Sequence, residues 1–468
     1  MSFTSLTFIL FFIVTSVAHW LIRSRRWQNL LLLAASYVFV GYSSLEAVAI
    51  LAAGTAVDAL ATGGMVSRPQ NKKALLWVSL ATNLGMLLVF KYFNFFAANV
   101  TGMLAGLGLE TNTLTLKMAL PLGISFYTLK KIAYVVVVYR GTLTPDGGWI
   151  DFALYVAFFP QFAAGPIDRP NHLLAQFSRT RTWHWENFFD AWQLLVTGVF
   201  KKLVIADTVA NVVERIFLLE APSIALLLVG GLGFTLQVLA DFSAYTDLSR
   251  GVARLLGIES SPNFNAPYLA VSPSDFWNRW HMTLTAWLKE HIFFPLRRAL
   301  ARRELGRWRW LAWALPPLVT MLASGFWHGT GWTYILWGLY YGVLIVIYHA
   351  LGLQPERWSA FTPKRALAWV VMFGLTVFGW LIFRAPSLKW LGDILTGSPW
   401  LYGRADLVAC LSSLSVIGVY ALPLLVYHLL DRWQFSHAWL RPLVHAASAA
   451  LTIIYLNAAP QDFIYFQF

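Results

Sequence analysis

Long apolar runs, separated by short polar turns, recur along nearly the whole chain. About 20 consecutive apolar residues let a helix cross the hydrocarbon core of a bilayer. The candidate membrane segments are Phe3–Ile22, Trp27–Tyr42, Leu45–Ala61, Ala74–Phe96, Ala119–Tyr139, Phe152–Ala164, Phe188–Ile205, Ile224–Ala240, Trp310–Phe326, Trp332–Leu351, Ala366–Phe383, Leu407–Leu430 and Leu443–Leu456. Some, notably Phe152–Ala164, are short enough to be re-entrant, so the pattern predicts about 10 to 13 membrane segments.

The runs favour helices over a membrane barrel. Helices satisfy their own backbone hydrogen bonds in lipid, and these runs are too long and too uniformly apolar to be alternating barrel strands. No linker or polar domain of useful size interrupts the series. The sequence therefore predicts an all-helical, multi-pass membrane protein with one domain spanning residues 1–468.

Composition supports this class. The chain is 58% hydrophobic and only 12% charged, whereas soluble domains carry about 25% charged residues. The single cysteine, Cys410, excludes an internal disulfide framework and a cysteine metal cluster.

The basic residues indicate orientation, because Lys and Arg concentrate in cytoplasmic loops. Arg23, Arg25 and Arg26 follow the first run, whereas the next turn carries only Glu46. This alternation predicts an N-terminus outside the cytoplasm. The net charge of +13 is then mostly a topology signal, and nucleic acid is a poor explanation for it.

Residues 241–309 are too polar to cross the membrane and rich in aromatics. A hydroxyl at Ser272, a proline after it and the carboxylate of Asp275 form a capping box. It predicts a helix that runs to about Phe294. On such a helix His281 shares a face with the residues four before and four after it, Trp277 and Thr285, while Arg279 lies elsewhere.

A basic stretch follows that helix, offset only by Glu304. One interpretation is a cytoplasmic topology anchor. The other is a cytoplasmic mouth that attracts an anionic donor, such as a phosphorylated cofactor or an acidic carrier protein. Its members are Arg297, Arg298, Arg302, Arg303, Arg307 and Arg309.

His328 lies between two apolar runs. An ionisable residue inside a bilayer is costly and by default marks a function, and histidine exchanges protons near pH 7. The neighbouring glycines, Gly325 and Gly329, would let a substrate or a second backbone approach closely. The simpler alternative is a histidine at a helix end that hydrogen-bonds to a neighbouring helix.

Several motifs, in order, resemble the successive signatures of the membrane-bound O-acyltransferase family, and most closely its bacterial alginate O-acetylation and teichoic-acid D-alanylation branch. The likeness extends from about Gln28 to the C-terminus. The motifs are Pro160-Gln161-Phe162-Ala163-Ala164-Gly165-Pro166-Ile167, Asp241-Phe242-Ser243-Ala244-Tyr245-Thr246-Asp247, Asn263-Phe264-Asn265-Ala266-Pro267-Tyr268, Phe276-Trp277-Asn278-Arg279-Trp280-His281, Gly325-Phe326-Trp327-His328-Gly329 and the closing Phe463-Ile464-Tyr465-Phe466-Gln467-Phe468.

The resemblance implies a fold and an activity. It implies a ring of helices around a central funnel, with His328 as the catalytic histidine and His281 towards the cytoplasmic side. The implied reaction moves an acyl group from a cytoplasmic thioester to a hydroxyl. Acetyl-CoA, or a carrier-protein thioester, would be the donor, and no cofactor is expected to be bound permanently. A periplasmic SGNH-type acetyltransferase and the bacterial inner membrane are the expected partner and location.

Lys130 and Lys131 depart from the family pattern, in which neutral polar residues commonly stand there. Two lysines inside Ala119–Tyr139 are costly in lipid. We therefore expect that they face a wet cavity or that the helix is broken near Pro121-Leu122-Gly123. They would contact donor phosphates, or simply mark the cytoplasmic end of the helix. Together with Arg279, Arg297 and Arg298 they are the candidate donor-binding residues.

The chemistry explains the need for a histidine. A hydroxyl is a weak nucleophile at neutral pH, and a general base that removes its proton contributes roughly 10²–10⁴-fold. A backbone N–H near Gly329 or the His281 imidazole would stabilise the oxyanion. No serine elbow of the hydrolase type is present. No Asp or Cys completes a metal site with the two histidines, so we expect no metal.

Other classes remain open. A transporter would show intramembrane charges and broken helices, and a polysaccharide-export scaffold would tolerate the loss of His328. Within the enzyme class, D-alanyl transfer to a cell-wall polymer and peptidoglycan O-acetylation are alternatives to O-acetylation of an alginate-, cellulose- or similar exopolysaccharide. The sequence does not name the polymer.

Overall fold

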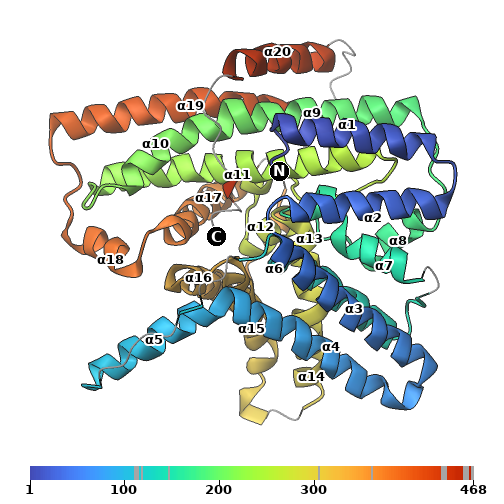
Figure 1. Cartoon of the computed structure of the whole chain (residues 1–468). Coiled ribbons are helices and arrows are strands. Elements are labelled where there is room, and N and C mark those ends of the chain that lie inside the picture. Colours follow the sequence, from blue (N-terminus) through green and yellow to red (C-terminus); the bar gives the residue numbers. More distant parts are fainter. Residues whose placement is uncertain are drawn as a thin grey trace. The chain divides into compact units, whose positions relative to one another are not determined.

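The computed structural model describes residues 1–109, 115–116, 120–145, 148–303, 306–359, 362–433, 440–456 and 463–464. Every regular element in these ranges is a helix (Figure 1), which confirms the predicted all-helical class. The chain divides into two compact units, and each is described by itself. The single membrane domain and the ring around a funnel stay predictions.

The first unit comprises Met1–Trp192 and Ser249–Ser261. Its helix α9 continues into the second unit. Its helices are α1 (Leu6–Leu21), α2 (Arg25–Gly41), α3 (Leu45–Ser67), α4 (Lys72–Leu87), α5 (Phe93–Gly106), α6 (Ile124–Tyr139), α7 (Gly148–Ala157), α8 (Pro170–Phe177) and α9 (Trp185–Phe200). Helices α3, α4 and α6 pack on one another.

The second unit comprises Gln193–Leu248 and Pro262–Phe468. Its helices are α10 (Asp207–Phe217), α11 (Ile224–Leu255), α12 (Pro273–Arg279), α13 (Met282–Leu288), α14 (Phe294–Ala301), α15 (Leu311–His328), α16 (Trp332–Ala350), α17 (Pro363–Arg384), α18 (Leu388–Gly397), α19 (Arg404–Trp433) and α20 (Leu440–Tyr455). The last turns of α11 belong to the first unit.

Helices α15 and α16 form the closest helix pair of the second unit. A Cβ at Gly325 would overlap the carbonyl oxygen of Tyr334, and one at Gly338 would overlap that of Met321. The absence of side chains at these two glycines lets the backbones touch. Of the two uses foreseen for the glycines near His328, the approach of a second backbone is therefore the one observed at Gly325.

Six helical stretches in the described part are long and apolar enough to cross a membrane, so the chain is a multi-pass membrane protein. They are Leu45–Ser67, Pro69–Gly106, Ile224–Leu255, Trp332–Ala350, Pro363–Arg384 and Arg404–Tyr427. Leu6–Leu21 and Pro442–Tyr455 are shorter apolar helices.

The predicted 10 to 13 segments exceed this number because several apolar runs form shorter or interrupted helices. The run Phe152–Ala164 ends its helix α7 at Ala157 and then makes a single 3₁₀ turn, Phe159–Gln161. Helices α2 and α6 have 17 and 16 residues. The sequence pattern counts apolar runs, whereas the helices stop where the backbone turns.

Candidate active site

His328 is the last residue of α15 and is 5% exposed. Aromatic rings surround its imidazole. The centroid distances are 4.9 Å to Trp327, 5.0 Å to Trp337 on α16 and 5.5 Å to Phe383 on α17. All of these residues belong to the second unit. An imidazole among indole and phenyl rings is shielded from water, which suits a general base that must stay neutral until it takes a proton.

The segment that carries His281 differs from its prediction. The capping box is confirmed, because the Asp275 backbone N–H donates to Ser272 Oγ at 3.1 Å. The single helix to Phe294 is wrong: α12 ends at Arg279 and α13 begins at Met282. His281 lies in the break, with φ 41° in the left-handed region. Residues with side chains rarely adopt this conformation.

Asn263 holds the break in place. Its carbonyl oxygen accepts from the Met282 backbone N–H at 2.9 Å. Its side-chain oxygen accepts from Thr283 twice, from the backbone N–H at 3.2 Å and from the hydroxyl at 2.7 Å. These bonds replace those that a continuous helix would make, and they offset the left-handed residue. The role of Asn263 was missed, although its motif was recognised.

His281 is fully buried. Its ring lies 4.8 Å from Phe242 on α11 and 5.9 Å from Trp327. Burial lowers the pKa of His281 to about 3, because a charged imidazole loses its hydration there. The two predicted histidines therefore flank the same tryptophan ring, and His281 is neutral at physiological pH.

The shared face predicted for Trp277, His281 and Thr285 is half correct. Thr285 donates its backbone N–H to the His281 carbonyl at 2.9 Å, so these two lie one turn apart. Trp277 lies on the other side of the break. Its ring instead packs 5.5 Å from Trp337.

The predicted donor-binding arginines fall into two environments. Arg279 donates to Asp275 at 2.7 Å, four residues earlier on the same helix. The arginines of the basic stretch are exposed, and within the described residues they form no ion pair. They are Arg297, Arg298, Arg302, Arg303, Arg307 and Arg309. Glu304 lies outside the described residues.

Lys130 and Lys131 lie in the middle of α6, not at an end of it. The predicted break is confirmed: α6 begins directly after Gly123, which has φ 72°. A Cβ there would lie 2.5 Å from the carbonyl oxygen of Phe162. Both lysines are buried, 2% and 0% exposed.

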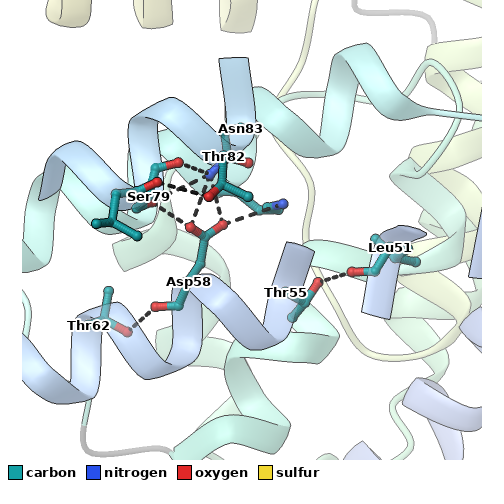
Figure 2. A network of polar contacts seen from close by, with 9 residues as sticks. Leu51, Thr55, Asp58, Thr62, Ser79, Thr82 and Asn83 are labelled. Carbon is teal, nitrogen blue, oxygen red and sulfur yellow. Dashed lines mark hydrogen bonds and ion pairs between the residues drawn. The ribbon is translucent and has the colours of Figure 1, made fainter. Parts of the chain in front are cut away.

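Lys131 forms an ion pair inside the first unit. Its Nζ lies 3.4 Å from Asp58 on α3, and both side chains are fully buried. Figure 2 shows Asp58 facing Ser79 and Asn83 of α4, which donate to the same carboxylate, the amide of Asn83 at 2.9 and 3.0 Å. A Cβ at Gly54 would lie 2.5 Å from Lys131 Nζ, so this glycine makes room for the ammonium group.

Lys130 has separate partners in the same unit. Its Nζ donates to Gln161 Oε1 at 3.1 Å and lies 4.8 Å above the Tyr155 ring. Gln161 donates in turn to Asp168 at 2.6 Å and to Ser260 at 2.7 Å. Lys131 thus lies in an internal ion pair, and Lys130 lies in a hydrogen-bonded network that reaches Asp168. Contact of either lysine with donor phosphates stays a prediction.

A third charged cluster was not foreseen from the sequence. Lys202 lies 2.9 Å from Asp207 and 2.8 Å from Asp241. Asp241 also accepts from the Ile464 backbone N–H at 2.6 Å, and Lys202 lies 4.3 Å above the Phe463 ring. This cluster fixes the beginning of the closing motif inside the second unit. Residues 465–468 of that motif lie outside the described residues.

The described residues contain no group of three or more His, Cys, Asp or Glu side chains that could hold a metal ion.

Comparison with known proteins identifies the family. A model of the membrane-bound O-acyltransferase family matches residues 146–388, which include both histidines. The chain belongs to this family. It is therefore an acyltransferase of the membrane-bound class.

Named relatives of this O-acyltransferase fall into three groups. The chain is 35% identical to the probable alginate O-acetylase AlgI of Pseudomonas putida, over 83% of this chain and 78% of the relative. It is 30% identical to the peptidoglycan O-acetyltransferase of Helicobacter pylori, over 86% and 79%. It is 28% identical to the teichoic acid D-alanyltransferase of Bacillus subtilis, over 56% and 68%.

Proposed function

We propose that this O-acyltransferase performs the membrane step in O-acetylation of an exported polysaccharide. In this proposal an acetyl group passes from a cytoplasmic thioester, acetyl-CoA or a carrier-protein thioester, across the bacterial inner membrane. The acceptor is alginate, cellulose or a similar exopolysaccharide. The support is the order of similarity: the alginate O-acetylases match more closely and over more of the chain than the D-alanyltransferases.

The main support for the mechanism is the position of His328, which lies at the end of α15 and is buried among aromatic rings. As general base its imidazole removes the proton of the attacking hydroxyl. It then returns that proton to the departing thiolate. His281, neutral and in contact with the same tryptophan, assists placement of the donor more than proton removal.

The donor is attracted by the exposed arginines of the basic stretch. CoA and acidic carrier proteins both bring phosphate groups, and a cationic surface raises their local concentration. This attraction weakens with salt, because charges are screened over about 8 Å at physiological ionic strength.

A further protein completes the reaction on the other side of the membrane. The thioester lies in the cytoplasm, whereas the polysaccharide has been exported. We propose that an SGNH-type periplasmic acetyltransferase docks at the outer face and carries the acetyl group onward.

The proposal is tested with His328→Ala and His349→Ala. His349, near the end of the next helix, is exposed, so its loss controls for removal of any histidine. We expect His328→Ala to fold, insert and lose acyl transfer, while His349→Ala keeps it. The assay uses detergent-purified protein with radiolabelled acetyl-CoA, followed by mass spectrometry of the polymer made in cells.

The outcomes separate the alternatives. A well-expressed His328→Ala variant with full acetylation would reject the catalytic assignment and favour an export scaffold. Transport that changes without loss of acyl transfer would favour a transporter. Transfer of D-alanine in place of exopolysaccharide acetylation would favour the activity named for the D-alanyltransferases. Acetylation of peptidoglycan would favour the activity named for the peptidoglycan O-acetyltransferase.

A further inference from the structure

Hydrogen-bond donors without partners gather beside His328. Trp337 is fully buried and its ring lies 5.0 Å from that of His328. Trp277 is 4% exposed and packs 5.5 Å from Trp337. Ser324 is fully buried on α15, one helical turn before His328. Among the described residues, neither indole N–H nor the Ser324 hydroxyl has a hydrogen-bond partner.

This is unusual because roughly 90% or more of buried polar groups in proteins are hydrogen-bonded. Two tryptophans of the same unit that are not buried do have partners. Trp369 donates its indole N–H to the carbonyl oxygen of Tyr268 at 2.8 Å, and Trp390 donates to that of Leu219 at 3.0 Å. Among the described residues, the indole N–H groups of Trp280 and Trp380 also lack a partner. Their rings join those of Trp277 and Trp337 in one aromatic cluster that reaches His328, so the unsatisfied donors gather in this cluster and Trp337 is the one in contact with the imidazole.

A molecule held against His328 must bring that acceptor. A tryptophan N–H only donates, so it selects an oxygen with a free lone pair and does not recognise a cation. A thioester offers one such oxygen at its carbonyl. The rings of Trp337 and Phe383, 5.2 Å apart, give a short acyl chain an apolar wall. In such a low-dielectric site, donors fixed in advance stabilise developing charge more than they would in water.

We infer that the indole N–H groups of Trp337 and Trp277, with the Ser324 hydroxyl, bind the carbonyl oxygen of the acyl thioester. The inference rests on the proposed function and deepens it. The hydroxyl oxygen of the acceptor bonds to the carbonyl carbon, its proton passes to His328, and the carbonyl electron pair moves onto oxygen. The three donors stabilise this oxyanion. When it collapses, the carbon–sulfur bond breaks and the thiolate leaves with the proton from His328.

The test replaces tryptophan by phenylalanine, which keeps an aromatic ring and removes the N–H. We expect Trp337→Phe to lower kcat about 10²-fold, the usual effect of losing one oxyanion donor. Its thermal stability should not fall, because no hydrogen bond within the chain is lost. Trp277→Phe and Ser324→Ala should show the same pattern with smaller factors. Trp369→Phe and Trp390→Phe are the matched controls, with lower Tm and unchanged transfer.

A spectroscopic measurement reports the contact directly. Acetyl-CoA labelled with ¹³C at the carbonyl is bound to His328→Ala protein, which holds the donor without turnover. We expect the infrared carbonyl band to lie at lower frequency than in an apolar solvent. Adding Trp337→Phe should move the band back towards the apolar position.

Two results would overturn the inference. One is a wild-type rate in Trp337→Phe, and the other is a fall in Tm that accounts for the lost activity, as expected if ordered water satisfies the indole. Its failure differs from failure of the proposed function. If transfer requires His328 but not the indole N–H groups, only the inference is wrong. If wild-type protein transfers no acyl group from a thioester, the proposed function is wrong.

Discussion

Asp58 and His328 are both buried ionisable residues on apolar helices, but different groups surround their side chains. In the first unit, Asp58 accepts hydrogen bonds from Ser79 and Asn83 (Figure 2). It also pairs with Lys131. In the second, His328 is surrounded by aromatic rings, beside donors that the described residues leave unsatisfied. At Asp58 the chain itself supplies the hydrogen-bond donors and the counter-charge. Near His328 the indole N–H groups of Trp277 and Trp337 have no acceptor among the described residues.

The comparison refines a common inference about membrane proteins. Ionisable residues inside a bilayer mark function by default, and this rule predicts donor contacts for Lys130 and Lys131. A buried charge is also stable when a partner charge and hydrogen bonds compensate for lost hydration. The chain supplies those partners to Asp58 and Lys131, whereas the indole N–H groups of Trp277 and Trp337 near His328 have no partner among the described residues.

The largest expected effect is the loss of stability when the buried ion pair between Asp58 and Lys131 is broken. Asp58→Asn leaves the buried ammonium group of Lys131 without its counter-charge, so we expect a loss of about 3–5 kcal/mol in stability. The double variant Asp58→Asn/Lys131→Met removes both charges and should recover most of it. Thermal unfolding in detergent measures both. Full stability of the double variant with no acyl transfer would instead place this pair in the chemistry.

The variant His281→Asn tests how much the imidazole of His281 contributes to acyl transfer. Asparagine tolerates the left-handed backbone that His281 adopts, so the variant removes the imidazole without straining the break. We expect acyl transfer to fall about 10-fold or more, because losing one hydrogen bond that positions the donor costs about 1.4 kcal/mol. Acceptor binding should be retained. Loss of binding to the periplasmic partner, with donor binding intact, would contradict the assigned position.

A smaller effect is expected outside both sites. Reversing the exposed charges of Arg297, Arg298 and Arg302 to glutamate should raise the apparent donor KM several-fold and leave kcat nearly unchanged. The difference should shrink as salt increases. The matched control reverses Arg404, an exposed arginine at the first residue of α19. An unchanged donor KM would return the stretch to the role of topology anchor.

A further effect concerns the pH dependence of stability. The pKa of His281 in the folded protein, about 3, lies below its usual value of 6.5. Between these values the unfolded chain binds the extra proton, so stability is present above pH 6.5 and is lost as the pH falls. His281→Asn should flatten the fall in Tm between about pH 6 and pH 4. An equally steep fall in the variant would assign acid sensitivity to other groups.

The sequence predicted the features that depend on neighbouring residues. Runs of apolar residues specify helices in lipid, and a hydroxyl and a carboxylate three residues apart specify the cap at Ser272. Helix α6 begins directly after Gly123. The sequence motifs around His281 and His328 identified these residues as candidate site residues. Each of these follows from local composition and from backbone conformations that single residues permit.

Only the tertiary structure decided what surrounds each buried group. The break at His281 depends on Asn263, which lies earlier in the chain and supplies the bonds that a continuous helix would otherwise make. The pairing of Lys131 with Asp58 joins residues on different helices. The sequence determined which polar groups enter the apolar interior. Their partners are set by packing between distant segments, because in a low-dielectric interior a charge or donor is stable only beside a specific complementary group.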